Sequence, residues 1–207
     1  YPTCNADVVV GPGWEKMINR ADGRDLLKEC ADNGFTVTRS LEEFENSDAT
    51  KAFCVPYEHD TPLPAERGNY LECAALKTLD VLSKNPNGFF LMIEGSQLDD
   101  YGHFNDIDLL MQETHDFDRT IGAVMKWAAK NGETLVVVTA DHETGGLTLV
   151  GGDLNEGKVV CKFSTGDHSG VMVPIYAFGP GAMNFTGIME NSDIPRKIAG
   201  LVGLEIE

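Results

Sequence analysis

Carboxylate and imidazole side chains occur together at three places in this chain. Asp99 and His103 follow Glu94, and further along come the pairs Asp141-His142 and Asp167-His168. Because Asp99 and His103 are four residues apart, one helical turn would place both side chains on the same face. Carboxylate oxygens and imidazole nitrogens are common ligands of divalent metals in proteins. The pattern therefore predicts a metal site.

Short apolar segments stand next to these residues. Residues 89–93 form an apolar run that stops at Glu94-Gly95-Ser96, which is typical of a buried strand ended by a turn. Residues 135–138 predict a central strand just before Asp141-His142, and residues 171–178 predict the last strand just after Asp167-His168. Open α/β sheets bind their ligands at strand ends. A single Asp-His pair is more often structural, but three such clusters at strand ends favour one shared site.

The rest of the chain alternates between strand and helix patterns. Apolar periodicity and end signals predict strands at 7–10, 35–38 and 52–55, a helical turn at 14–18, a capping-box helix opening at Ser40, and helices at 24–33, 69–82, 106–130 and 194–201. This alternation predicts a parallel sheet covered by helices. We expect one α/β domain over residues 1–207, with a small β-hairpin at about 145–163.

Composition narrows the classes of molecule that this protein is expected to bind. The chain has 207 residues, 42% of them hydrophobic, and a formal net charge of −17, which argues against nucleic acid or an anionic membrane surface as a partner. Bound divalent cations would reverse this field locally and admit an anionic substrate. No apolar run reaches the length of a membrane span. The five cysteines include no CxxC pair. Cys30, Cys54 and Cys73 are expected to be buried small hydrophobes. Because the number of cysteines is odd, at least one thiol has no internal disulfide partner.

Three motifs resemble the alkaline phosphatase family. They are IEGSQLD at 93–99 followed by His103, VVVTADHETGG at 136–146, and TGDHSGVMVPIYAFGPGA at 165–182. Weaker similarity runs through nearly the whole chain. The resemblance implies a three-layer α/β/α fold with a mainly parallel sheet, here incomplete, and a phosphomonoesterase that carries two Zn²⁺ and one Mg²⁺ in the complete enzyme.

The resemblance also assigns ligands. Asp99, His103 and His168 match the ligands of one zinc. Asp141 and His142 match two ligands of a second zinc, and Glu94 matches a magnesium ligand. Three protein ligands would leave the first zinc an open position, as a catalytic zinc requires.

Several functional residues of the family have no counterpart here. The nucleophilic serine, an aspartate bridging two metals, a further magnesium ligand and a phosphate-binding arginine belong to the family's amino-terminal half. The chain resembles the carboxyl-terminal half, so we expect no catalytic residue in it and no activity from it alone. Ser96 matches no family nucleophile and is expected to cap the helix that carries Asp99.

Further expectations follow from the resemblance. The substrate or product would be a phosphate monoester or inorganic phosphate, and the location periplasmic or secreted. Many members carry a long insertion between His142 and His168 that helps form a dimer. Only a hairpin's length is present, so that dimer is not assumed, although exposed sheet edges predict a homo-oligomer.

Two alternatives remain open. One is another member of the same superfamily, such as a cofactor-independent phosphoglycerate mutase, and the other is a non-catalytic metal-binding module. The Glu-Gly-Ser to Asp to His spacing and the Gly-Asp-His-Ser-Gly stretch favour the phosphatase. Glu143 and Thr144 either orient His142 or form a turn. His115, Asp116 and Asp118 are expected on the solvated face of the long helix or bonded to neighbouring loops.

Overall fold

A computed structural model describes residues 3 and 5–204, so Cys4 lies outside the described residues. The chain divides into two compact units. The first comprises Tyr1–Glu94 and Asp116–Thr120, and the second comprises Gly95–His115 and Ile121–Glu207. A single domain over residues 1–207 stays a prediction. Among the described residues, no helix is both long enough and apolar enough to cross a bilayer.

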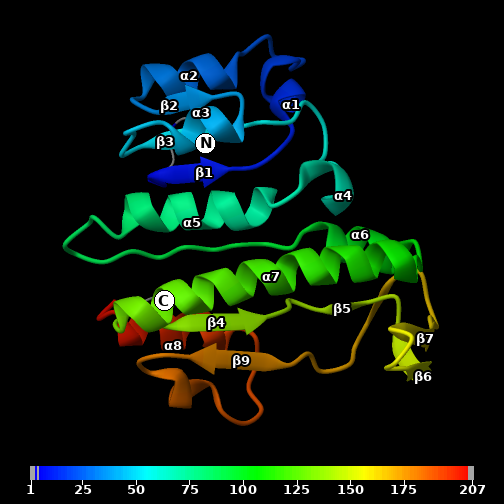
Figure 1. Cartoon of the computed structure of the whole chain (residues 1–207). Helices are drawn as coiled ribbons and strands as arrows, with labels where there is room; N and C mark the ends of the chain where they lie inside the picture. Colours follow the sequence, from blue (N-terminus) through cyan, green and yellow to red (C-terminus); the bar gives the residue numbers. More distant parts are fainter. Residues whose placement is uncertain (1–2, 4, 205–207) are drawn as a thin grey trace. The chain divides into compact units, whose positions relative to one another are not determined.

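A three-stranded parallel sheet forms the centre of the first unit (Figure 1). Strand β3 (Ala52–Cys54) lies between β1 (Val8–Val10) and β2 (Thr36–Thr38). The register aligns Val9, Phe53 and Val37 across the three strands. Parallel neighbours need crossover connections. The chain supplies them as α1 (Trp14–Ile18), α2 (Leu26–Asp32) and α3 (Leu41–Glu45), and continues into α4 (Pro64–Arg67) and α5 (Tyr70–Leu82).

Side chains of β3 alternate between two apolar clusters. Phe53 packs with Leu27 and Cys30 of α2, whereas Ala52 and Cys54 pack with Phe44 of α3. Successive residues of a strand point to opposite faces of its sheet, so the helices that supply these clusters cover both faces. The first unit is therefore a three-layer α/β/α arrangement. The predicted α/β class is confirmed.

Local signals set the helix ends in this unit. The Ser40 side chain accepts a hydrogen bond from the backbone N–H of Glu43 at 3.1 Å, which confirms the predicted cap of α3. The Glu43 carboxylate in turn accepts from the backbone N–H of Arg39 at 2.8 Å. Cys30 and Cys54 are fully buried as predicted, whereas Cys73 is only half-buried because it faces a surface cavity.

A buried ion pair joins two helices of the first unit. The Arg67 guanidinium bonds the Asp116 carboxylate at 2.7 Å, and their side chains are 4% and 1% exposed. Arg119 bonds the same carboxylate and also lies 3.3 Å from Glu72. Of the two alternatives predicted for Asp116, the solvated face is wrong; the carboxylate is bonded to neighbouring side chains instead, and its charge is buried because two guanidinium groups compensate it.

The second unit is made of helices and antiparallel strand pairs. Its helices are α6 (Gln97–His103), α7 (Ile107–Asn131, less the part in the first unit), η1 (Ala182–Phe185) and α8 (Asp193–Leu201). Its strands pair as β4 (Val136–Thr139) with β9 (Ile175–Phe178), β5 (Glu143–Thr144) with β8 (His168–Ser169), and β6 (Thr148–Asp153) with β7 (Lys158–Lys162). The β6–β7 pair is a hairpin within the segment where one was expected.

Two strand predictions for the apolar runs differ from the structure. Residues 89–93 form no strand and have no ladder partner among the described strands. Phe90 and Met92 are 71% and 73% exposed while their neighbours are half-buried, so the run is not a buried strand. Among the described strands, β4 pairs with β9 alone, in antiparallel direction, and is half-buried rather than central. Parallel pairing among the described strands is confined to the first unit.

Candidate metal centre

Helix α6 presents the first two candidate ligands. Asp99 lies in its first turn and His103 is its last residue, and the Oδ2 of Asp99 lies 3.3 Å from the Nε2 of His103. This confirms that the spacing of four places both on one helix face. Ser96 occupies the N-cap position with helical backbone angles (φ −60°, ψ −38°) and makes no capping bond through its side chain. The predicted cap is wrong, because a capping side chain requires an extended backbone at that position.

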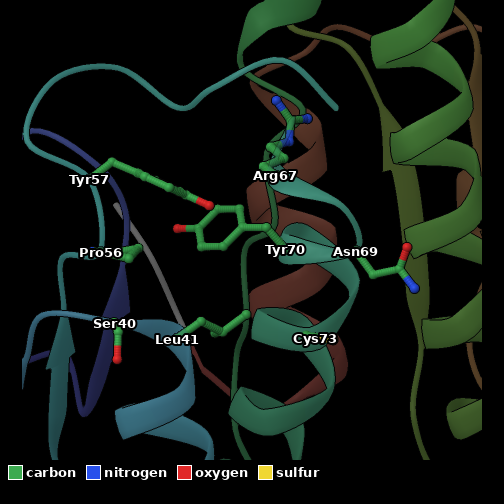
Figure 2. A pocket seen from close by; sticks show the side chains of 8 residues that line it. All are labelled: Ser40, Leu41, Pro56, Tyr57, Arg67, Asn69, Tyr70 and Cys73. Carbon is green, nitrogen blue, oxygen red and sulfur yellow. The ribbon is translucent and has the colours of Figure 1, made fainter. Parts of the chain in front are cut away.

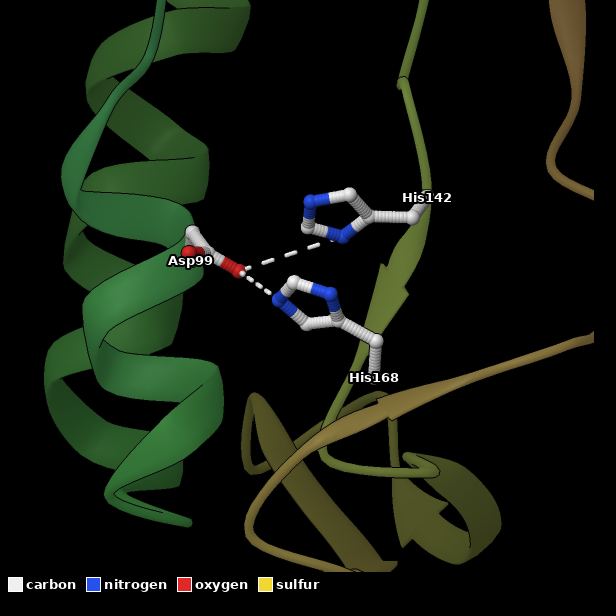
Figure 3. A group of neighbouring side chains, drawn as sticks. All are labelled: Asp99, His142 and His168. Carbon is white, nitrogen blue, oxygen red and sulfur yellow. Dashed lines mark ion pairs between the residues drawn. The ribbon is translucent and has the colours of Figure 1, made fainter.

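The short β5–β8 strand pair positions the other two candidate histidines, His142 and His168. Its register sets Thr144 opposite His168, and His142 stands immediately before β5. The His142 and His168 rings consequently stack, with centroids 3.6 Å apart and an interplanar angle of 21°. Figure 3 shows both rings facing the Asp99 carboxylate of α6. Residues distant in the sequence thus converge within the second unit.

The side chains of Asp99, His103 and His168 approach one another closely. The Nε2 atoms of His103 and His168 are 3.2 Å apart, and the Nε2 of His168 lies 3.5 Å from the Oδ1 of Asp99. The Nε2 of His103 lies 3.3 Å from the other carboxylate oxygen, Oδ2 of Asp99. Ligands about 2.0–2.1 Å from a tetrahedral ion stand about 3.3–3.4 Å from one another. The donor types suit zinc and the separations come near this spacing, with the two rings approaching different oxygens of Asp99.

The orientation of His103 leaves its Nε2 available to a metal. Its Nδ1 lies 2.9 Å from the carbonyl oxygen of Gly166. Because a carbonyl only accepts, Nδ1 carries the proton and donates, which leaves the Nε2 lone pair facing Asp99 and His168. This hydrogen bond also raises the pKa of His103, and the charges of Asp99, Asp167 and Asp100 act in the same direction against partial desolvation. Protons therefore compete with a metal for this ring.

Asp99 is held as a carboxylate. Partial burial alone would raise its pKa, but a hydrogen bond from the Thr144 hydroxyl and the nearby rings of His103, His142 and His168 outweigh burial and lower the pKa. The ionised group is the form that binds a cation.

Of the two residues predicted to bind a second zinc, Asp141 is far more exposed than His142. The Nε2 of His142 lies 3.3 Å from the Oδ2 of Asp141, whose side chain is largely exposed. The Nδ1 of His142 lies 4.0 Å from the Oδ1 of Asp99. Ligand atoms of Asp99, His142 and His168 form one compact group, and those of His103, Asp167 and His168 form another. Neither group is the predicted first-zinc set of Asp99, His103 and His168, and neither includes Asp141 or Glu94; the metal roles assigned to all of these residues stay predictions.

Two residues of this region carry no role in the sequence-based assignment. Asp167 joins the His103–His168 group, although only its neighbour was assigned as a ligand. Gly102 lies inside α6, where a Cβ would come within 2.9 Å of Thr144 Cβ and Cγ2. A glycine inside a helix destabilises it, so its presence one residue before His103 is the sequence signal for this close approach.

Glu143 orders the loop rather than the metal site. Its carboxylate accepts hydrogen bonds from the backbone N–H groups of Gly146 at 3.1 Å and Leu147 at 2.8 Å, and from the Ser169 hydroxyl. These bonds outweigh the effect of burial and lower the pKa of Glu143. Of the two interpretations left open for Glu143, the turn role is the one that its contacts support.

A surface cavity in the first unit is lined by other types of residue than the metal centre. Its volume is about 380 Å³, and Tyr57 and Tyr70 meet there edge to face with ring centroids 5.2 Å apart (Figure 2). The lining guanidinium of Arg67 is paired with Asp116, and desolvation raises the pKa of the lining Cys73 thiol. The cavity therefore presents no activated nucleophile.

Comparison with known proteins agrees with the fold. The family model for alkaline phosphatase matches residues 4–162. The chain belongs to the alkaline phosphatase family.

Relatives and solved structures that match most of this chain include several named alkaline phosphatase. Alkaline phosphatase 4 of Bacillus subtilis is 28% identical, with 90% of this chain and 55% of that protein covered. The structure of the enzyme from the Antarctic bacterium TAB5 superposes with a TM-score of 0.90 at 36% identity and covers 98% of this chain and 62% of that chain. A TAB5 variant with Mg bound superposes with a TM-score of 0.89 at 33% identity, over 99% and 63%. The chain spans about half the length of the curated relatives it matches.

Proposed function

We propose that this chain is the metal-binding portion of a phosphomonoesterase. The observation that supports it is the close approach of Asp99, His103 and His168: the two Nε2 atoms are 3.2 Å apart, and they lie 3.3 and 3.5 Å from the two different carboxylate oxygens of Asp99. We assign these three residues to a first zinc. Three protein ligands leave one tetrahedral position for a phosphate oxygen.

Asp141 and His142 would hold a second zinc, and Glu94 a magnesium ion, together with ligands supplied by the amino-terminal half of the family's fold. When bound, the zinc ions supply Lewis acidity to the attacking and leaving oxygens of a phosphoryl displacement. This chain's own residues would bind the metal ions and hold the ligand side chains in position. Gly166 fixes the His103 ring through its carbonyl, and Asp99 brings negative charge between the imidazoles.

The whole reaction would be hydrolysis of a phosphate monoester through a phosphoserine. The nucleophilic serine would come from the amino-terminal half, since no residue here matches it. Ser96 is the obvious candidate within this chain, but it stands at the first turn of α6 with helical backbone angles and no assigned role in the ligand set. We therefore propose that the chain binds metal and does not turn over substrate alone, and that the complete protein is periplasmic or secreted.

The alternatives differ in what they predict. A phosphoglycerate mutase would also use Asp and His ligands, but the matched family model and the relatives favour the phosphatase. A non-catalytic metal-binding module would bind zinc without any activity being restored by an amino-terminal half.

The test is the metal content of the purified chain, measured by elemental analysis after dialysis against zinc. We expect about one zinc per chain and no hydrolysis of an aryl phosphate. His168→Ala should abolish zinc binding, since its Nε2 lies within 3.5 Å of both other ligands. His115→Ala is the matched control, because this exposed histidine of α7 belongs to neither ligand group and should leave the zinc content unchanged.

Other outcomes would contradict parts of the proposal. Equal loss of zinc in both variants would mean non-specific binding. Turnover by the chain alone would place a nucleophile within it, and Ser96→Ala would be the first variant to assay. Activity restored by a separately produced amino-terminal half of a relative would favour the phosphatase over the non-catalytic module.

A further inference from the structure

Three Asn-Gly dipeptides occur in this chain, at Asn33-Gly34, Asn87-Gly88 and Asn131-Gly132. Asparagine is a thermolabile residue, and it loses its amide most readily before glycine, because a residue without Cβ lets its backbone nitrogen approach the Asn Cγ. All three dipeptides are exposed, and their glycines have positive φ angles of 86°, 85° and 79° in chain order. Neither sequence, nor exposure, nor glycine conformation therefore distinguishes the three.

The side chains of Asn33 and Asn131 are held by hydrogen bonds at helix ends. Asn33 is the C-cap of α2, and its Nδ2 donates to the Glu29 carbonyl at 2.8 Å. Asn131 ends α7, and its Oδ1 accepts from the backbone N–H of Glu133 at 3.0 Å and from the Thr134 hydroxyl at 2.8 Å. Loss of the amide requires Cγ to turn toward the following backbone nitrogen, so these bonds must break before the reaction.

The Asn87 side chain is not held in this way. Residues 85–88 form a β-turn with Pro86 in its second position, closed by a hydrogen bond from the Gly88 N–H to the Asn85 carbonyl at 3.1 Å. The Asn85 Oδ1 accepts from the backbone N–H of Asn87 at 3.0 Å. Both bonds fix the backbone. The amide group of the Asn87 side chain makes no hydrogen bond to the part of the chain that the structure describes.

The backbone bond of each glycine differs in how easily it opens. The N–H groups of Gly34, Gly88 and Gly132 all donate to a carbonyl, at 3.0, 3.1 and 2.8 Å in that order. The bond of Gly132 to Ala128 continues the hydrogen-bond ladder of α7, so it opens only when the helix end frays. The bond of Gly88 closes one exposed turn, and such bonds belong to the least stable parts of a fold.

We propose that Asn87 is a modification site, at which the folded protein loses the side-chain amide spontaneously while Asn33 and Asn131 are protected. The Gly88 nitrogen loses its proton to solvent base and attacks Cγ of Asn87. The N–Cγ bond forms, the Cγ–Nδ2 bond breaks, and Nδ2 takes up a proton and leaves as ammonia. Water then opens the cyclic imide at either carbonyl, which gives aspartate or isoaspartate. Only water is consumed, and no oxidant or reductant takes part.

The products change the turn that follows α5. Both carry one negative charge more than Asn87. In isoaspartate the main chain runs through Cβ and Cγ, so it is one atom longer between Asn85 and Gly88. The hydrogen bond that closes the turn depends on the normal length of this segment, so we expect it to be lost. This inference does not depend on the proposed metal binding, because residues 85–88 contain none of the assigned ligands.

The test follows the three asparagines in the purified chain during storage in a mildly alkaline buffer. Peptide mapping by mass spectrometry measures conversion at each position, and an isoaspartate-specific methyltransferase labels the isoaspartate product. We expect Asn87 to convert about ten-fold faster than Asn33 or Asn131, the factor expected when one or two further hydrogen bonds must break before reaction. In concentrated urea the three rates should become similar, since all three sites are Asn-Gly.

Asn87→Gln is the matched variant. Its longer side chain keeps the amide but forms a cyclic imide far more slowly, so most of the isoaspartate label should disappear while the conversion of Asn33 and Asn131 stays unchanged. Conversion of Asn33 or Asn131 as fast as that of Asn87 in the folded chain would overturn the inference. Reaction of Asn87 in urea but not in the folded chain would also overturn it, because the turn would then protect the site.

Discussion

Phe53 and Cys54 of β3 in the first unit are shielded from solvent, whereas Tyr176 of β9 in the second unit is 65% exposed. The first unit derives its order from two apolar clusters on the faces of one parallel sheet. In the second unit, the strands that carry the metal-site residues are two residues long and are joined largely by polar contacts. We infer that the first unit is stabilised mainly by apolar burial and the second mainly by its polar network, to which a metal bound as proposed above would add.

The largest difference should come from removing a core aromatic side chain. Phe53→Ala is expected to lower the free energy of unfolding by about 4 kcal/mol, because the side chain is buried and packs edge to face on Phe35. Tyr176→Ala, the exposed counterpart in the second unit, should cost less than about 0.5 kcal/mol. Urea unfolding followed by circular dichroism measures both, and equal effects would contradict the comparison.

The next largest loss of stability should come from breaking the buried ion pair of the first unit. Asp116→Ala leaves the Arg67 guanidinium buried without its carboxylate and should cost about 3 kcal/mol. Lys28→Ala is the control, since its pair with Asp32 is solvent-exposed and its loss should leave the free energy of unfolding close to that of the wild type. Comparable losses from the two variants in the same urea titration would show that burial of the Arg67–Asp116 pair has no special consequence.

Zinc should stabilise the second unit selectively. At a hundredfold excess over its dissociation constant, a ligand stabilises the folded state by about 2.7 kcal/mol. We expect zinc to slow hydrogen exchange at the Gly145 amide, which bonds the Asp167 carbonyl, and to leave the Val55 amide of the first unit unchanged. A chelator should reverse the effect. If His168→Ala responded to zinc as the wild type does, the site would lie elsewhere.

The smallest expected losses of stability come from replacing two serines at helix starts. Ser40→Ala should cost about 1 kcal/mol because its side chain caps α3. Ser96→Ala should cost less than about 0.5 kcal/mol, since the side chain of Ser96 makes no capping bond. Thermal unfolding of the two variants resolves this difference. A larger loss from Ser96→Ala would mean that its hydroxyl has a function that capping geometry does not reveal.

The sequence by itself determined the features that depend on neighbours along the chain. The periodic apolar pattern predicted α5 and α7, the Ser40 motif predicted the cap of α3, and the spacing of Asp99 and His103 predicted their common helix face. The glycine-rich segment predicted a hairpin, which is present as β6 and β7. These features are short-range, because propensity, capping and helical spacing act within a few residues.

Only the tertiary structure decided which distant segments meet. Residues 89–93 have the composition of a buried strand, yet no described strand pairs with them, because a ladder requires a partner that composition does not specify. The antiparallel direction of β4 and β9 and the burial of Asp116 against Arg67 also depend on contacts far apart in the chain. The same holds for Thr144: its hydroxyl reaches Asp99 only because α6 approaches β5 at Gly102, and that approach is a property of packing.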